Sequence, residues 1–137
     1  MSTLLYVEDE QWRFASLIRM LSNEFTVVSA RDADQALAVL EAQGKDAESP
    51  TIDIILLDIS LPTSKRIPDS NWGKTSGINF ARFVLKELKY DIPIVCYTAR
   101  NNAQIHEELL DDIGVKEVIS KSKSMLEVRD ILKKYVG

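Results

Sequence analysis

One run of residues sets the architecture of this chain: Thr51-Ile52-Asp53-Ile54-Ile55-Leu56-Leu57-Asp58-Ile59-Ser60-Leu61-Pro62. Its apolar composition, rich in isoleucine and without polar alternation, predicts a strand buried on both faces, as in a parallel sheet covered by helices. Ligands of such sheets bind beyond the carboxyl ends of the strands, where Asp58 lies. Pro62 stops the strand from continuing. Asp58 is therefore either a chemical group at a sheet edge or an aspartate that begins a turn.

The length and composition fit one globular domain over residues 1–137. A chain of this length closes a core without disulfides, and the lone Cys96 has no partner for one. With 45% hydrophobic and 28% charged residues, the chain contains no apolar run near the roughly 20 residues that span a membrane. Its N-terminus lacks the basic flank and cleavage site of a secretory signal, so we expect a cytoplasmic protein.

The acidic balance of the chain limits its partners. A formal net charge of −4 and a pI near 5.0 disfavour a general nucleic-acid surface, because phosphate contacts need clustered lysine and arginine. We therefore expect protein partners, and neither direct nucleic-acid binding nor membrane association.

Four further short segments have the composition of strands: 4–7, 25–29, 93–97 and 115–119. Each of the five strands precedes a segment with apolar residues at helical spacing. In the first two helices the predicted inward residues are Phe14, Leu17, Ile18 and Leu21, then Ala33, Ala36, Leu37 and Leu40. In the last three they are Ile78, Ala81, Leu85 and Leu88, then Ile105, Leu109 and Ile113, then Met125, Val128, Leu132 and Tyr135. Helix starts and ends are marked by the capping pairs Asp32/Gln35, Asn101/Gln104 and Ser124/Glu127 and by Gly44 and Gly114.

Five strands that alternate with five helices indicate right-handed βαβ units. We therefore predict an α/β fold, a three-layer flavodoxin-like (βα)5 sandwich with a five-stranded parallel sheet of order 2-1-3-4-5. All strands of such a sheet end at the same edge, which gathers Glu8, Asp9, Asp58, Thr98 and Lys121. Asp53, at the start of its strand, is predicted to be structural. Core positions are predicted for Tyr6, Cys96 and Tyr97.

The gathered residues suit phosphoryl transfer with a divalent cation. Closely packed carboxylates repel one another unless a cation or a shared proton neutralises them. A few hard oxygen ligands with room for water suit Mg²⁺. An aspartate attacks phosphorus to give an aspartyl phosphate, while an ammonium and a hydroxyl balance the charge of the phosphoryl oxygens. Asp58, Lys121 and Thr98 fit these roles.

The chain resembles the receiver domain of two-component response regulators over essentially its whole length. The family's acidic pair corresponds to Glu8-Asp9, and its phosphoacceptor corresponds to Asp58 in the motif Leu-Leu-Asp-Ile-Ser-Leu-Pro. Its switch hydroxyl corresponds to Thr98, which the small residue Ala99 follows, and its lysine to Lys121. Each match alone is weak, but together they fall at the ends of the expected strands.

The resemblance implies that Asp58 accepts a phosphoryl group from a phosphohistidine of a histidine kinase or phosphotransfer protein. Lys121 would pair with that group, and Thr98 would bond one of its oxygens and so alter the surface that partners bind. Such a domain assists its own phosphorylation and dephosphorylation but is a regulatory module rather than an enzyme. Ser60 and Arg100 would flank the phosphoryl group. Mg²⁺ would be bound by Glu8, Asp9, Asp58 and the backbone carbonyl of Ser60.

Three features depart from the family pattern. Val118 stands where members usually carry an aromatic residue whose ring swings inward when the switch hydroxyl moves. Ser122 replaces the usual proline after the lysine, and we expect a trans Lys121-Ser122 bond because a non-proline cis bond costs about 2.5 to 4 kcal/mol. The loop at 63–76 is unusually long. Either it contacts an acidic partner or shields the site, or it is a solvated flap whose Trp72 packs on the neighbouring surface.

Two other functions compete with the phosphoacceptor role. One is a phosphorylation-independent, pseudo-receiver interaction domain, which Val118 and Ser122 favour and the full set of acidic, hydroxyl and lysine residues disfavours. The other is a phosphohydrolase for small substrates with Asp58 as its nucleophile. Its haloacid-dehalogenase form needs an acidic residue two positions later, where this chain has Ser60.

Overall fold

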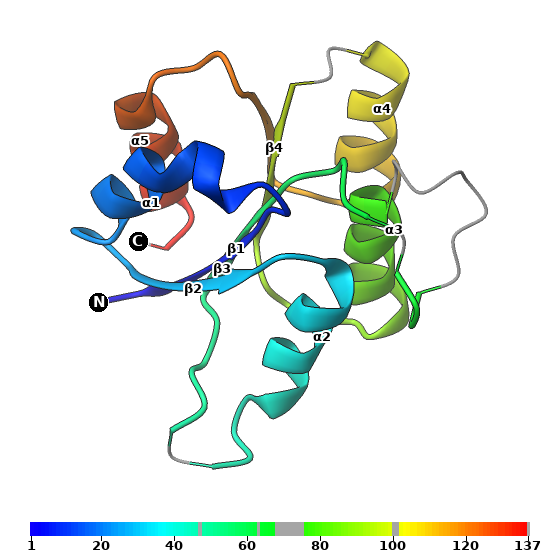
Figure 1. The fold of residues 1–137 in the computed structure, drawn as a ribbon. Helices are drawn as coiled ribbons and strands as arrows, with labels where there is room; N and C mark the ends of the chain where they lie inside the picture. Colours follow the sequence, from blue (N-terminus) through cyan, green and yellow to red (C-terminus); the bar gives the residue numbers. More distant parts are fainter. Residues whose placement is uncertain (47, 63, 68–75, 100–101, 137) are drawn as a thin grey trace.

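Five parallel strands form the middle layer of the molecule (Figure 1). The computed structural model describes residues 1–46, 48–62, 64–67, 76–99 and 102–136. The strands lie in the order β2-β1-β3-β4-β5, which confirms the predicted flavodoxin-like sandwich. Their bounds are β1 (Thr3–Val7), β2 (Thr26–Ala30), β3 (Ile54–Leu57), β4 (Ile94–Thr98) and β5 (Glu117–Ser120).

Helices cover both faces of the sheet (Figure 1). One face carries α1 (Ala15–Leu21), entered through the 3-10 turn η1 (Gln11–Phe14), together with α5 (Met125–Lys134). The other carries α2 (Ala33–Ala42), α3 (Ser76–Arg82) and α4 (Ala103–Glu107). α3 and α4 continue into π-helical segments, η2 (Phe83–Glu87) and η3 (Glu108–Ile113). Within the described part of the chain, no helix combines the length and apolar character needed to cross a bilayer.

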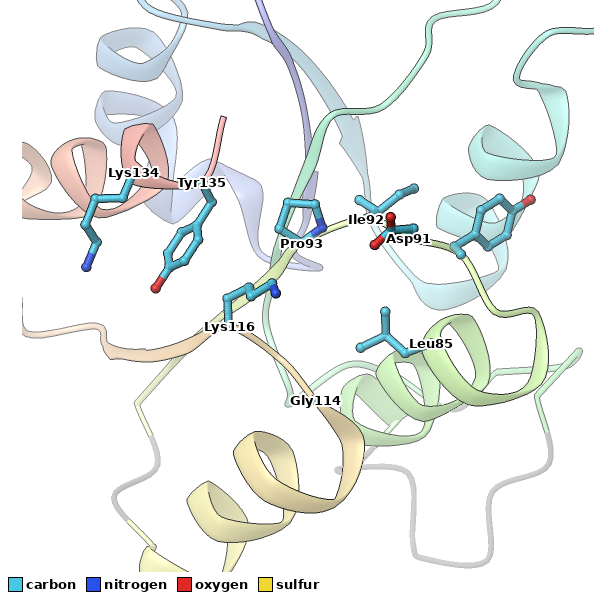
Figure 2. A pocket seen from close by; sticks show the side chains of 9 residues that line it. Leu85, Asp91, Ile92, Pro93, Gly114, Lys116, Lys134 and Tyr135 are labelled. Carbon is cyan, nitrogen blue, oxygen red and sulfur yellow. The ribbon is translucent and has the colours of Figure 1, made fainter. Parts of the chain in front are cut away.

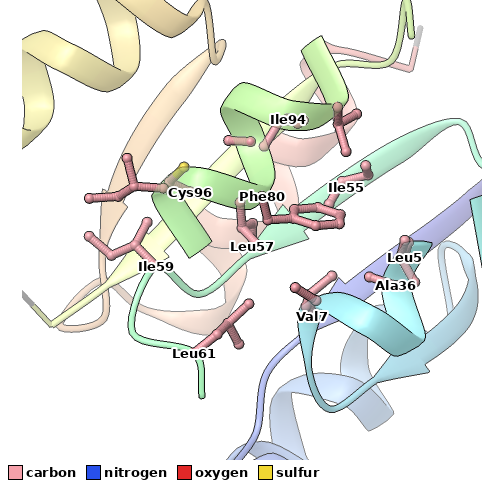
Figure 3. Close-up of a cluster of buried hydrophobic side chains, with 14 of the residues drawn as sticks. Leu5, Val7, Ala36, Ile55, Leu57, Ile59, Leu61, Phe80, Ile94 and Cys96 are labelled. Atoms are coloured by element: carbon pink, nitrogen blue, oxygen red, sulfur yellow. The ribbon is translucent and has the colours of Figure 1, made fainter. Parts of the chain in front are cut away.

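Two hydrophobic clusters hold the layers together, one on each face of the sheet. In β3, Ile55 and Leu57 belong to the larger cluster under α2, α3 and η3, whereas Ile54 and Leu56 belong to the smaller one under α1 and α5. Figure 3 shows the larger cluster, with Phe80 of α3 against the strands. All of β3 is buried from both sides, which explains its uninterrupted apolar run.

Most helix ends follow the predicted capping signals. At the start of α2, the Gln35 N–H donates to the Asp32 carboxylate over 2.7 Å. At the start of α5, the Glu127 N–H donates to Ser124 Oγ over 3.2 Å. Gly114 ends η3 with a left-handed φ of +95°, a conformation that glycine adopts without strain.

Three predictions about the helices were wrong. Asn102 caps α4, whereas Asn101 lies outside the described residues. Leu88 is 42% exposed, because the wider turn of η2 before it shifts the face that an α-helical period assigns. Val84 is buried, at normal helical spacing from Phe80 and Ala81. Met125 is 43% exposed, since the first turn of α5 does not reach the core and its inward face begins at Val128.

The described start of the long loop is anchored to α2. The Asp34 carboxylate accepts hydrogen bonds from the Ser64 hydroxyl over 2.6 Å and from the next two backbone N–H groups over 3.0 and 3.2 Å. Arg66 forms a bidentate ion pair with Glu41, with both N–O distances at 2.6 Å. Ile67 is buried in the larger cluster. The charge of Arg66 is therefore already paired within the chain.

Candidate functional site

A pocket of about 190 Å³ opens at the edge of the sheet where the strands end. It brings together five of the residues predicted from the sequence: Glu8, Asp9, Asp58, Ser60 and Lys121. The strand order explains this convergence, because β3 lies between β1 and β4, and β5 adjoins β4. Three further lining residues are Glu10, Arg13 and Ala99.

Lys121 pairs with two of the acidic residues. Its Nζ lies 2.7 Å from Glu8 Oε1 and 3.5 Å from Asp58 Oδ2. Glu8 is 1% exposed, Asp58 is 3% exposed, and the Lys121 side chain is 18% exposed. Buried charges need such pairing, because an unpaired one loses its hydration without compensation. Lys121 therefore stabilises the pocket as well as directing an ammonium at Asp58.

The floor of the pocket is buried and negatively charged. Burial and the neighbouring Asp58 carboxyl raise the pKa of Glu8 to about 7, although Lys121 lowers it in part. Burial also raises the pKa of Tyr6, and the nearby Glu8 adds to this effect. The Tyr6 hydroxyl is buried and has no hydrogen-bond partner among the described residues. The two raised pKa values indicate that negative charge is unfavourable in this buried pocket, so a bound cation would stabilise the site.

Three carboxylates fit a divalent cation. Glu8, Asp9 and Asp58 each place one oxygen within 4.8 Å of the other two. Glu8 and Asp58 are buried, while Asp9 is exposed at the pocket rim. Hard oxygen ligands with one side open to water suit Mg²⁺, which keeps several of its waters. These residues therefore fit the predicted ion, and the contribution of the Ser60 carbonyl stays a prediction.

The backbone around Asp58 is held by its neighbours. Ser60 donates its N–H to Asp58 Oδ1 over 3.0 Å, and Gly77 donates its N–H to the Ile59 carbonyl over 3.2 Å. A Cβ at position 77 would lie 2.3 Å from Ile59 Cα and 2.4 Å from the Asp58 carbonyl oxygen. Glycine is therefore needed for α3 to pack against the end of β3.

Thr98 lies beside the pocket rather than in its described lining. It is 1% exposed at the end of β4, and its carbonyl accepts the Lys121 N–H over 2.9 Å. The next residue, Ala99, lines the pocket. The Lys121-Ser122 peptide bond is trans, as predicted. Arg100 and the loop residue Trp72 lie outside the described residues, so their predicted roles stay predictions.

Two other residues of β3 and β4 and their flanks, Asp53 and Cys96, are structural, as predicted. Asp53 accepts the Thr3 N–H over 2.7 Å, which ties the starts of β3 and β1 together. Cys96 is fully buried in β4. Burial raises the pKa of Cys96 to about 12, so its thiol stays protonated and unreactive.

Sequence reasoning missed two pairs of residues at the pocket. Glu10 and Arg13 line it and form an ion pair of 2.6 Å. Phe14 and Tyr97 contact the Lys121 ammonium, at 4.6 and 5.7 Å from their ring centroids. Two features of the sequence could have identified these residues. Glu10 and Arg13 have helical spacing directly after the acidic pair, and Tyr97 directly precedes Thr98.

A larger pocket, of about 510 Å³, lies at the opposite edge of the sheet, near the starts of β4 and β5 (Figure 2). It is lined by Leu85, Tyr90, Asp91, Ile92, Pro93, Gly114, Lys116, Lys134 and Tyr135. Parallel sheets bind ligands at the carboxyl ends of their strands, and this pocket lies at the amino ends. The smaller pocket, which holds the buried charges, is therefore the candidate functional site.

The sheet order 2-1-3-4-5 gives the chain a CheY-like α/β fold, with the acidic pocket at the carboxyl edge of the sheet. The family model of the response regulator receiver domain matches residues 4–133. The chain therefore belongs to the response regulator receiver domain family of two-component systems, and the resemblance seen in the sequence is confirmed. A search of curated proteins finds no significant match.

Solved structures share the fold at low sequence identity. A CheY-like receiver domain protein from Methanospirillum hungatei is 18% identical, with a TM-score of 0.76 over 99% of this chain and 94% of that one. The receiver domain of a putative Luxo repressor from Vibrio parahaemolyticus is 15% identical, with a TM-score of 0.78 over 98% and 89%. The response regulator TrrA from Thermotoga maritima, in complex with Mg²⁺ and BeF, is 24% identical, with a TM-score of 0.69 over 98% and 99%.

Proposed function

We propose that residues 1–137 act as a single cytoplasmic receiver domain in which Asp58 accepts a phosphoryl group from a phosphohistidine of a histidine kinase or phosphotransfer protein. The main support is the Lys121 ammonium, 3.5 Å from Asp58 Oδ2 in a pocket that also holds Glu8 and Asp9. As an Asp58 oxygen bonds to phosphorus, the bond from phosphorus to the imidazole nitrogen breaks and the histidine leaves. Lys121 balances the charge of the phosphoryl oxygens during this transfer.

The residues around Asp58 favour one of its two oxygens as the attacking atom. Oδ1 already accepts the Ser60 N–H over 3.0 Å, so Oδ2, on the Lys121 side, is the nucleophile. Thr98, at the end of β4, would donate its hydroxyl to a phosphoryl oxygen. Mg²⁺ held by Glu8, Asp9, Asp58 and the Ser60 carbonyl would neutralise charge on the transferred group. The Mg²⁺ named in the TrrA complex supports the same ion here.

Phosphorylation would act on a downstream protein through two states of the domain. A partner responds only if its affinity differs between the phosphorylated and unphosphorylated states. Val118 occupies the position of the usual aromatic residue, so this chain has no ring there to take part in the response. The movement of Thr98 and its loop would alter the surface of α4, β5 and α5 without such a ring.

A phosphorylation-independent interaction domain is the second candidate. Val118 and Ser122 favour it, because both stand at positions that usually serve the phosphorylation response. The ion pairs favour it as well, since Lys121 lies closer to Glu8, at 2.7 Å, than to Asp58, at 3.5 Å. A domain of this kind would bind its partner with the same affinity in the presence and in the absence of a phosphodonor.

Incubation with phosphoramidate and Mg²⁺, followed by intact-mass measurement, separates the two functions. Wild type should gain one phosphoryl group, and a metal chelator should prevent the gain. Asp58→Asn should gain none, whereas Asp53→Asn, a matched change at the other end of the same strand, should behave as wild type. Wild type that stays unmodified would contradict the phosphoacceptor role and favour the interaction domain.

A further inference from the structure

The Lys121 ammonium contacts two aromatic rings in addition to its two carboxylates. It lies 4.6 Å from the centroid of the Phe14 ring and 5.7 Å from that of Tyr97. An ammonium within about 6 Å of a ring centroid is attracted by the negative face of the ring. The contact strengthens where water is excluded, and the Lys121 side chain is only 18% exposed.

The two rings form one wall that joins separate elements. Phe14 ends η1, and Tyr97 lies in β4 directly before Thr98. Their planes meet at 69° with centroids 5.9 Å apart, an edge-to-face arrangement that is attractive between aromatic rings. Tyr97 is 4% exposed and Phe14 is partly buried, so the two rings cover this side of the ammonium.

Glu8 and the rings differ in what else they bind. Glu8 is the closest partner of Lys121, at 2.7 Å, but it is also one of the proposed ligands of the divalent cation. The rings carry no charge and ligate no cation, so a bound Mg²⁺ would not compete for them, although Phe14 also lies 5.9 Å from the Arg13 guanidinium. We therefore propose that Phe14 and Tyr97 are positioning residues for phosphoryl transfer, which hold the Lys121 ammonium beside Asp58 while Glu8 is shared. This inference rests on the proposed function.

The wall is separate from the aromatic residue that family members usually carry. Val118, at that position, packs against the larger cluster on the α2, α3 and α4 face. Tyr97 belongs to the smaller cluster, and Phe14 packs against it on the α1 and α5 face. The aromatic contact of this chain therefore reaches the site from the opposite side of the sheet.

Two measurements on the full chain test this inference. Ring currents should shift the Lys121 ε-methylene protons upfield in the NMR spectrum, and Phe14→Leu should move them toward the free-lysine position. In phosphorylation by phosphoramidate at saturating Mg²⁺, Phe14→Leu should react about fivefold more slowly, which corresponds to the loss of a partly exposed cation–π contact of about 1 kcal/mol. Phe14→Tyr and Tyr97→Phe keep their rings and should retain both the wild-type shift and the wild-type rate.

A double-mutant cycle assigns the effect to the ammonium. In a Lys121→Met background, Phe14→Leu should cause no further loss of rate, because no ammonium remains for the ring to hold. If Phe14→Leu fails to fold, the phosphorylation rates of Tyr97→Leu and Tyr97→Phe are compared instead, because only the second variant keeps the ring at position 97. Equal rates in wild type, Phe14→Leu and Tyr97→Leu would overturn this inference and leave the proposed function standing. A slow Phe14→Leu with unchanged Lys121 shifts would also overturn it, whereas unmodified wild type would overturn both.

Discussion

Single residues in the pocket carry charges that a purely structural core avoids. Glu8 and Asp58 are almost fully buried, and one ammonium, that of Lys121, lies close to both. Such an arrangement lowers the stability of the fold, because one ammonium shared by two buried carboxylates does not fully compensate for their lost hydration. Unfavourable burial of charge is expected at functional sites, where residues are retained for binding or chemistry at the expense of stability.

Asp9 is expected to bind Mg²⁺ without supporting the fold. It is exposed, and its carboxylate belongs to the acidic cluster. Asp9→Asn should weaken Mg²⁺ binding by about tenfold or more in calorimetric titration. The free energy of unfolding without Mg²⁺ should change by less than about 0.5 kcal/mol. The control is Glu10→Gln, an adjacent acid on the pocket rim that pairs with Arg13; equal losses of affinity in both variants would count against the proposed ligand set.

The elements around the pocket hold its residues in place from different sides. β3 ends at Asp58, and α3 begins against it at Gly77, where a side chain has no room. The segment that leaves β3 is fastened to α2 through Asp34. The geometry of the site therefore depends on contacts between elements as well as on the strand that carries the nucleophile.

Gly77→Ala should destabilise the protein through a backbone clash. The new Cβ would lie 2.3 Å from Ile59 Cα, so α3 or the end of β3 has to move. We expect the free energy of unfolding to fall by about 2 to 4 kcal/mol in urea denaturation. Gly44→Ala is the control, because position 44 has open space but a φ of +74°. It should lose only about 1 kcal/mol, from backbone strain alone, and similar losses in the two variants would contradict the close approach.

Asp34 should make stability depend on acid pH. Burial tends to raise the pKa of Asp34, but hydrogen bonds from Ser64, Lys65 and Arg66 lower it below its usual range. Because the folded pKa lies below the unfolded one, the carboxylate stabilises the fold above about pH 4, and this contribution is lost as the pH falls through the folded pKa.

Asp34→Asn should therefore reduce the free energy of unfolding by about 1 kcal/mol at pH 7. The difference from wild type should shrink as the pH falls from about 5 to about 3. Urea unfolding at several pH values measures both effects. Asp111→Asn, at an exposed acid of η3, serves as the control. A difference that stays constant with pH would show that the carboxylate charge does not hold the loop.

For the whole molecule, the strand order and the convergence at one edge could be predicted from the sequence. Apolar runs followed by amphipathic helices specify parallel βαβ units, and parallel strands bring their carboxyl ends together. The charged site residues were identifiable because each lies within two residues of the end of a predicted strand: Glu8, Asp9, Asp58 and Lys121.

Other features depend on tertiary packing that a local pattern does not contain. The contact of Phe14 and Tyr97 with Lys121 joins three elements, and apolar spacing alone places both rings in the core. Leu88 was assigned to the wrong face because the π-helical turn before it breaks the helical period. The anchor of the loop on Asp34 links residues about 30 positions apart that no short motif connects.

The central claim is that Asp58 is the phosphoacceptor, and chemical trapping tests it most directly. The protein is treated with phosphoramidate and Mg²⁺, reduced with borohydride, which converts an aspartyl phosphate to homoserine, and then mapped by peptide mass spectrometry. We predict homoserine at position 58 of the wild type, and none when a chelator is present or in Asp58→Asn. Homoserine at another acidic residue, with Asp58 unmodified, would contradict the claim.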